Sequence, residues 1–432
     1  MTTIKSDEIT INKISDEQTI KFLKVLFYLF IFFIPSRILV AGIAFSYSDI
    51  VLIVLLLFCA SLIAMHAILV PFWIYYNTRF LFRVICIISF ALIIGYFNHF
   101  LGKVKLNFND VIPDYFVFIL IFLSCIAISI ISVSKDFMQR SLKLYAMSIT
   151  LASIVAFVIE KPVFLENRFA GFMIDANAWG MCVAIGIVIS VNYIIHEAKI
   201  ARKLYYLFCM SILLVSLAFS YSTGSVIGAL GGISVSFFAK LYSSLLTKNM
   251  KGFLISLIIY FIIFFSINAA IIHFGVLGKL KSVLIDRTVY KETSEGTLLI
   301  SRRMQYKLGF KMFLENPIIG IGWGGYLAKF QENYHKNIEI HNTYLRILVE
   351  TGLVGFCLFI MFISHLFYCC AKCLKHYAIN DDYIGMSLSN LLLSLLTSFC
   401  LFFTTYEATA QRFFWIVCGF IYVLYQMRFL PK

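Results

Sequence analysis

Apolar stretches long enough to cross a lipid bilayer recur along almost the whole of this 432-residue chain. A membrane-spanning helix needs about 20 predominantly apolar residues, and an α-helix satisfies its own backbone hydrogen bonds in lipid. The chain is 61% hydrophobic and only 13% charged, whereas soluble proteins carry about 25% charged residues. The short alternating segments of an outer-membrane barrel are absent from the sequence. The sequence therefore predicts an all-α polytopic membrane protein.

These stretches divide into twelve predicted spans. Pro35 interrupts the first one, but a proline can kink a membrane helix without ending it. The break "SYSTG" separates the seventh span from the eighth. The predicted spans are 22–43, 49–69, 81–98, 115–134, 143–160, 178–195, 204–220, 224–243, 253–275, 343–368, 383–404 and 411–428.

The spans imply a simple domain organisation. Residues 1–21 form a cytoplasmic N-terminal segment, 22–275 carry spans one to nine, 276–342 form a large loop, and 343–432 carry spans ten to twelve. The N-terminal segment is polar and mixed in charge, and it lacks the basic region, apolar region and cleavage site that follow one another in a signal peptide. We therefore expect the first span to act as its own signal.

Lysine and arginine are unevenly distributed between the short loops. With the N-terminus inside, twelve of them lie in inner loops and four in short outer loops, as the positive-inside rule demands. The inner ones include Lys199, Lys203, Lys372 and Lys375. This orientation places both termini in the cytoplasm and loop 276–342 outside. The net charge of +14 thus fits membrane anchoring and not nucleic-acid binding.

The outer loop contains a predicted helix, "SRRMQYKLGFKMFLENP" (Ser301–Pro317). At 100° per residue, Arg303, Lys307 and Lys311 form a basic stripe, whereas Arg302 falls among apolar side chains. The helix is expected on or near the membrane surface. An arginine on an apolar face is costly unless it has a partner. Arg302 is therefore either paired within the protein or an anion ligand, because its guanidinium matches phosphate geometry.

The predicted helix ends at "ENPIIGIGWGGY", a glycine-rich run. It is no dinucleotide fingerprint, because no strand precedes it and no βαβ unit surrounds it. We expect its glycines to let the loop fold closely against the membrane domain.

Further polar residues face the same predicted side. Arg168 lies in "ENRFAGFMIDANAWG", where Asp175 and Asn177 are expected to cap the next helix. His341 and Asn342 lie at the outer mouth of span ten. Asn342 is expected to be a helix N-cap. His341 is either an interfacial residue or a functional group that acts as a base or hydrogen-bond donor. Because Arg168 and Arg302 are predicted on the same outer face, the functional interpretation is favoured.

Arg168, Arg302 and His341 together suggest a cationic site at a lipid surface. No outer serine–histidine–acid set, paired carboxylates or H-E-x-x-H spacing stands out beside them. Arginines can stabilise the charge on a pyrophosphate leaving group, while a histidine handles the proton of an attacking hydroxyl. The substrate is therefore expected to be an anionic lipid.

The eleven cysteines lie in or beside apolar runs, so no disulfide framework is expected. Cys369, Cys370 and Cys373 cluster at a predicted helix end. His376 alone does not complete a zinc site with these three cysteines. The cysteines are therefore expected to pack in the core or to lie at the membrane edge.

Three segments in order resemble the signature of the O-antigen ligase and polymerase superfamily. They are "ENRFAGFMIDANAWG", "SRRMQYKLGFKMFLENPIIGIGWGGY" and "HNTYLRILVETGLVG", within residues 160–360. The resemblance implies a GT-C-like fold of about a dozen helices, with a large periplasmic loop between helices 9 and 10. It also implies metal-independent, inverting glycosyl transfer from undecaprenyl pyrophosphate, without a cofactor.

The resemblance also implies roles for particular residues. Arg168 and Arg302 match the two essential arginines of the family, and His341 matches its essential histidine. All three are expected to be catalytic. Arg168, Arg302 and Arg303 are expected to bind the pyrophosphate.

One family feature is absent from this chain. Many members open a membrane helix with a Ser-Arg pair, whereas here Val226 follows Ser225. If that arginine contributes in relatives, another group must replace it here. Arg412, at the outer start of span twelve, is the candidate for this pyrophosphate contact.

The resemblance leaves two enzymatic functions open. A polymerase would transfer a glycan chain from undecaprenyl pyrophosphate to the end of a lipid-linked repeat unit, and the segment around His341 favours it. A ligase would move the glycan onto lipid A-core. A flippase is disfavoured, because the spans are almost free of buried charge.

The expected partners are the lipid-linked glycan, the acceptor glycan, membrane lipids and a chain-length regulator. The expected location is the bacterial inner membrane, with the active site facing the periplasm.

Overall fold

The computed structural model describes most of the chain. The described residues are 17–36, 38–40, 43–45, 47–64, 93–102, 134–159, 164–165, 168–173, 175–247, 302–334, 339–408 and 411–429, with single positions between 89 and 128 and between 254 and 265.

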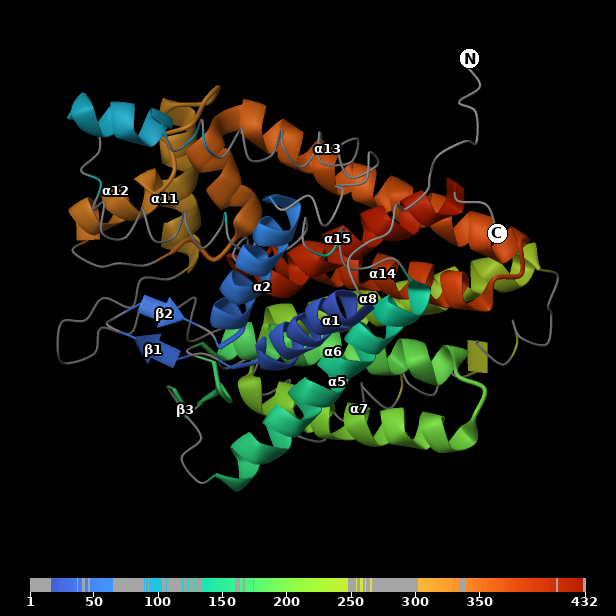
Figure 1. The fold of residues 1–432 in the computed structure, drawn as a ribbon. Coiled ribbons are helices and arrows are strands. Elements are labelled where there is room, and N and C mark those ends of the chain that lie inside the picture. The colour runs from blue at the N-terminus through green and yellow to red at the C-terminus, as the bar shows by residue number, and fades with distance from the viewer. Residues whose placement is uncertain are drawn as a thin grey trace, which may run out of the picture.

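Helices make up most of this part of the chain (Figure 1). They are α1 (Glu17–Phe33), α2 (Tyr47–Ala64), α5 (Lys135–Val158), α6 (Ala176–His196), α7 (Ile200–Ser220), α8 (Thr223–Leu246), α11 (Arg302–Glu315), α12 (Gly325–Tyr334), α13 (Thr343–Ile379), α14 (Tyr383–Phe402) and α15 (Arg412–Gln426), followed by a 3-10 turn (Met427–Phe429). Two short antiparallel hairpins pair β1 (Ile38–Val40) with β2 (Ile43–Phe45), and β3 (Phe164–Leu165) with β4 (Arg168–Phe169).

Six of the described helices are long and apolar enough to cross a membrane. They are α5, α6, α7, α8, α13 and α14, and each overlaps a predicted span. The helical membrane class is thereby confirmed, and so is the "SYSTG" break, since α7 ends at Ser220 and α8 begins at Thr223. The count of twelve spans and the GT-C likeness stay predictions. The predicted spans 81–98, 115–134 and 253–275 lie largely outside the described residues.

The prediction for the first span was wrong at its second half. α1 ends at Phe33, and the chain turns at Pro35 into the β1–β2 hairpin instead of continuing as a helix to residue 43. Proline has no N–H to continue the helical hydrogen bonds. Ser36 then donates both its N–H, at 3.0 Å, and its hydroxyl, at 2.6 Å, to the Phe33 carbonyl oxygen. These bonds satisfy the end of the helix where the proline stops it.

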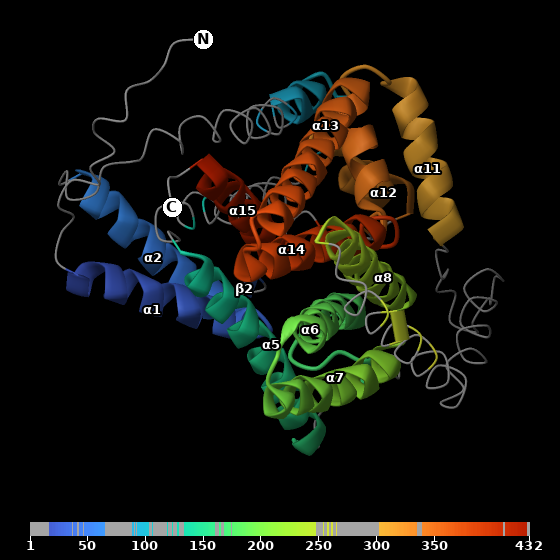
Figure 2. The same cartoon turned by 90° about the vertical axis from the view of Figure 1, so that its right-hand side faces the viewer.

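The helices run between two ends of the molecule. The α6–α7 and α13–α14 connections lie at one end, on the right of Figure 1, whereas β1, β2, β3, α11 and α12 lie at the other. Figure 2 shows α5 between the α1–α2 pair and the α6–α7 pair. The first end carries the loops predicted to be cytoplasmic, and the second carries the segments predicted to be outside. We refer to them below as the basic-loop end and the α11 end.

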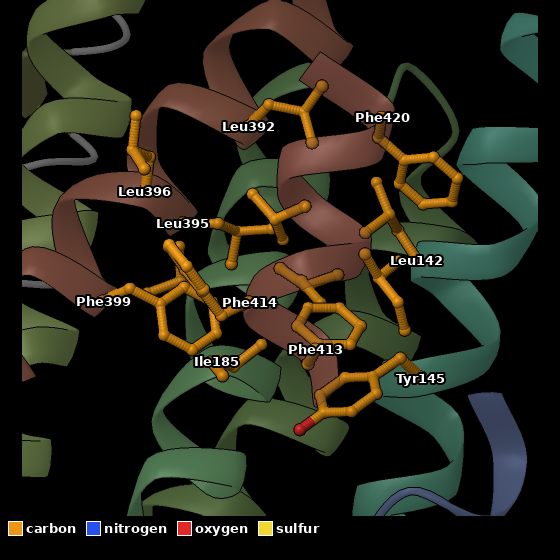
Figure 3. Close-up of a cluster of buried hydrophobic side chains, with 14 of the residues drawn as sticks. Leu142, Tyr145, Ile185, Leu392, Leu395, Leu396, Phe399, Phe413, Phe414 and Phe420 are labelled. Atoms are coloured by element: carbon orange, nitrogen blue, oxygen red, sulfur yellow. The ribbon is translucent and has the colours of Figure 1, made fainter. Parts of the chain in front are cut away.

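The core centres on α15, which is buried from Arg412 to Leu424. Figure 3 shows its Phe413, Phe414 and Phe420 between side chains of α5, α6 and α14. The ring of Phe413 stacks on Tyr145 with centroids 3.9 Å apart. Cys369, Cys370 and Cys373 are buried in the same hydrophobic core, which supports a packing role for these cysteines.

The glycine-rich loop folds closely against the membrane domain, as the sequence predicts. α13 is interrupted at Gly352, which has φ +64°. Across this break, Ile321 and Gly322 donate their N–H groups to the carbonyl oxygens of Val349 and Glu350, both at 3.0 Å. In return, Leu353 donates to the carbonyl oxygen of Pro317 at 2.8 Å. The loop thus takes up hydrogen-bonding groups that the interrupted helix leaves open.

Substituting Gly322 with alanine should destabilise the protein strongly. Gly322 has φ +93°, and a Cβ there would lie 2.1 Å from the backbone nitrogen of Gly95. The left-handed backbone alone costs about 1–2 kcal/mol for a side chain, and overpacking adds about 1–3 kcal/mol. Gly102→Ala is the matched control, because Gly102 also has a positive φ, +70°, but nothing lies within 4 Å of its Cβ position. Thermal unfolding in detergent should show a larger loss for Gly322→Ala, and equal losses would contradict the close approach.

Candidate functional site

α11 holds the backbone of His341 from one side. Gln305 Oε1 accepts the His341 N–H at 3.3 Å, and the Tyr306 hydroxyl donates to the His341 carbonyl oxygen at 3.0 Å. Arg302 precedes these two residues by three and four positions, which places it on the same face of the helix. The helix face that carries Arg302 is therefore the face that contacts His341.

Arg302 itself is half-buried at the start of α11. Within the described part of the chain, no hydrogen bond or ion pair of its guanidinium is found, so the interpretation of a structurally paired arginine gains no support there. Lys307 and Lys311 are exposed, which agrees with the basic stripe predicted from the sequence. Arg303 lies in α11, but its side chain is outside the described part.

The loop after α14 positions the ring of His341. The imidazole lies nearly parallel to the Tyr406 ring, with centroids 5.8 Å apart and 19° between the planes. Thr343 anchors this loop, because its N–H donates to the Phe403 carbonyl oxygen at 2.9 Å and its hydroxyl to the Tyr406 carbonyl oxygen at 2.9 Å. The same hydroxyl accepts the Ala408 N–H at 3.0 Å. Both the backbone and the ring of His341 are thus held in place.

Arg168 is oriented by the start of α6 and the end of α7. Its Nε donates to the Ser220 carbonyl oxygen at 3.0 Å, and its Nη2 donates to Asn177 Oδ1 at 2.8 Å. Both of these acceptors are neutral, so they fix the direction of the guanidinium without offsetting its charge. The β4 hairpin strand carries the residue to this position.

Two of the three residues predicted to cap helices do so in the structure, and the third has a different role. Asp175 accepts the Ala178 N–H at 3.3 Å and caps α6, and Asn342 caps α13 with its side chain. Both predictions are confirmed. The side chain of Asn177, by contrast, orients Arg168 instead of capping the helix.

A chain of contacts joins the two halves of this site. The Ser225 hydroxyl donates to the Asn177 carbonyl oxygen at 3.5 Å. Gly224 lies against Thr405, whose Oγ1 would be 1.8 Å from a Cβ at that glycine. Thr405 precedes the tyrosine that stacks on His341. The N-terminal ends of α6, α8 and α13 therefore meet at the α11 end of the molecule (Figure 1). Helix N-termini carry partial positive charge and favour anions.

Arg412 begins α15 and forms a bidentate ion pair with Asp49 of α2. Both side chains are buried. Such a pair offsets the charge of the guanidinium and occupies two of its donors, so it favours a structural role that ties α2 to α15. The proposed replacement of the family arginine by Arg412 is not tested by this geometry. At the position of that arginine, Val226 packs against the hydrophobic core.

A buried ion-pair network beside the site was missed by the sequence reasoning. Arg346 Nε pairs with Glu350 Oε2 at 3.2 Å, and its Nη1 pairs with Glu407 Oε1 at 3.3 Å. The guanidinium also lies over the Trp323 ring, 5.0 Å from its centroid. Glu350 Oε1 in turn accepts the Gly324 N–H at 3.0 Å. The network joins the glycine-rich loop, α13 and the loop that carries the tyrosine beside His341.

The expectation that the spans are almost free of buried charge was therefore wrong. The spacing of Arg346 and Glu350 is a helical i,i+4 pair that could have indicated part of the network. Glu407 lies far away in sequence, and no local pattern points to it. These charges lie in the first turns of α13 and in the adjoining loop, and not in the middle of the helix.

Arg346→Ala should cost about 3–5 kcal/mol of stability, because it leaves two buried carboxylates without this partner. Arg346→Lys should lose less, since it retains a charge but not the forked geometry. Thermal unfolding in detergent measures both, with the exposed Lys311→Ala as control. An Arg346→Ala protein as stable as the wild type would show that the network does not stabilise the fold.

The segment that contains α8, α11 and the start of α13 also matches a known family. Residues 208–360 match Wzy_C, described as O-Antigen ligase. The match includes Arg302, Arg303 and His341, whereas Arg168 precedes it. No curated protein matches the chain. Over residues 208–360, the Wzy_C match supports the family resemblance drawn from the sequence motifs.

Proposed function

We propose that this chain is a bacterial inner-membrane glycosyltransferase that polymerises a surface polysaccharide such as O-antigen. The donor is a glycan chain linked to undecaprenyl pyrophosphate, and the acceptor is the end of a lipid-linked repeat unit. The observation that carries the proposal is the contact between α11 and His341 inside the family-matched segment, because it brings the Arg302 face and the histidine together.

The residues suggest one division of labour. The acceptor hydroxyl attacks the anomeric carbon of the donor, the new glycosidic bond forms, and the bond from that carbon to the pyrophosphate oxygen breaks. His341 takes the proton of the hydroxyl. Arg168 and Arg302 stabilise the charge that develops on the leaving pyrophosphate. The N-termini of α6, α8 and α13 add partial positive charge at the same end.

The proposal places the site on the periplasmic side, because the loops rich in lysine and arginine lie at the opposite end. Transfer onto lipid A-core, as a ligase, is the second candidate. The description of the matched family favours it. Both reactions use the same donor and the same leaving group, so the residues named above serve either one.

The lipopolysaccharide ladder of a deletion strain separates the candidates. A core that carries a single repeat unit supports the polymerase. A bare core with accumulated lipid-linked polymer supports the ligase instead. A bare core with single lipid-linked units retained on the cytoplasmic side would indicate a flippase and contradict glycosyl transfer. Complementation with wild-type protein, but not with Arg302→Ala or His341→Ala, should restore the ladder.

A further inference from the structure

A groove lies between α8, α13 and α14 near the basic-loop end, away from the candidate site. Its volume is about 440 Å³. Phe238 and Tyr242 of α8 line one side, and Tyr368 and Ala371 of α13 line the other. Phe238, Tyr242 and Tyr368 are 63%, 45% and 50% exposed. The groove is thus an apolar channel open to the surroundings of the helices, which in a membrane protein are lipid acyl chains.

Two lysines of α13 stand at this groove. Lys372 and Lys375 both line it and are both exposed, and their i,i+3 spacing places them on one helix face. The Lys372 ammonium lies 5.4 Å from the centre of the Tyr368 ring, a cation–π contact that keeps it beside the groove. None of the described residues that line the groove is acidic. An apolar channel therefore ends at a local concentration of positive charge.

This combination matches an amphiphile with a hydrocarbon chain and a negative headgroup. Anionic lipids give the cytoplasmic leaflet a negative surface, and basic pockets between membrane helices on that side bind their headgroups. The sequence assigns Lys372 and Lys375, which lie near the C-terminal end of α13, to this side. In the proposed reaction the donor binds at the α11 end, so we assign the groove to a different lipid.

We propose that this groove binds one anionic glycerophospholipid of the cytoplasmic leaflet. Its phosphate lies between the Lys372 and Lys375 ammonium groups, and one acyl chain lies in the channel against Phe238 and Tyr242. The choice of occupant rests in part on the proposed function, but none of the groove residues is a candidate catalytic group, so lipid binding can be tested separately from glycosyl transfer.

Native mass spectrometry of the full-length protein tests this site. The protein is released from nanodiscs that contain phosphatidylglycerol and phosphatidylethanolamine in equal amounts. The wild type should retain one phosphatidylglycerol in preference to phosphatidylethanolamine. The Lys372→Gln/Lys375→Gln variant should lose this preference by about tenfold or more. Equal retention of the two lipids by the wild type would overturn the proposal.

Two further variants separate the groove from general surface charge. Lys199→Gln/Lys203→Gln removes the same charge at the start of α7, outside the groove, and should retain the lipid. Ala371→Phe keeps both lysines but fills the channel, and should lose the lipid without a change in melting temperature. Loss in the Lys199/Lys203 variant to the same extent, or retention in Ala371→Phe, would overturn the proposal. So would displacement of phosphatidylglycerol by undecaprenyl phosphate at equal concentration, since it would make the groove a polyprenyl site.

Discussion

Arg302→Ala should reduce glycan transfer by at least about 100-fold, the usual cost of removing one donor that stabilises developing charge. Its helix face contacts His341 through Gln305 and Tyr306, so the guanidinium is expected beside the reacting pyrophosphate. The fold should survive, because Arg302 has no ion pair within the described residues to lose. The measurement is polymer formation by purified protein from undecaprenyl-pyrophosphate-linked repeat units.

Two variants control this experiment. Arg302→Lys should retain partial activity, because lysine keeps the charge but not the forked geometry that matches phosphate oxygens. Lys311→Ala removes an exposed charge from the same helix and should leave the rate unchanged. If the Arg302→Ala protein formed polymer as fast as the Lys311→Ala protein, the assignment of Arg302 to the pyrophosphate would be wrong.

The membrane helices could be predicted closely from the sequence, because their length is set by the bilayer and their composition by lipid. α6, α7, α8 and α14 begin and end within a few residues of the predicted spans. The first span failed because hydropathy continues through Pro35 to the β1–β2 hairpin, whose residues are also apolar. Apolar composition alone does not distinguish a helix from a hairpin at a membrane edge.

The candidate site could be predicted only in part. Motif order singled out Arg168, Arg302 and His341, and helix periodicity separated Arg302 from the basic stripe of its neighbours. The groups that hold them could not be predicted. Asn177 looked like a helix cap, but it orients Arg168. Glu407 and the tyrosine that stacks on His341 lie far along the chain. These contacts depend on how helices distant in the sequence pack together, and a local sequence pattern does not encode that packing.

His341→Gln should lower glycan transfer by about 10²- to 10⁴-fold, the usual contribution of a positioned general base. The substitution should leave the local backbone unchanged. Gln305 and Tyr306 hydrogen-bond to main-chain atoms of His341, so these two hydrogen bonds do not depend on its side chain. The expected loss is in the rate of transfer, while binding of the lipid-linked donor is retained, because both arginines remain.

The pH profile and a matched histidine decide whether this loss reflects proton transfer. A general base accepts a proton only in its deprotonated form, so the wild-type rate should fall at acidic pH if the reaction uses such a base. The residual activity of His341→Gln should lack this acidic limb. His376→Gln alters a histidine near the opposite end of the same helix and should keep both the rate and the profile. An acidic limb that persisted in His341→Gln would assign the proton acceptor to another group. His341 would then be a positioning residue, held by Tyr406 to shape the acceptor side of the site.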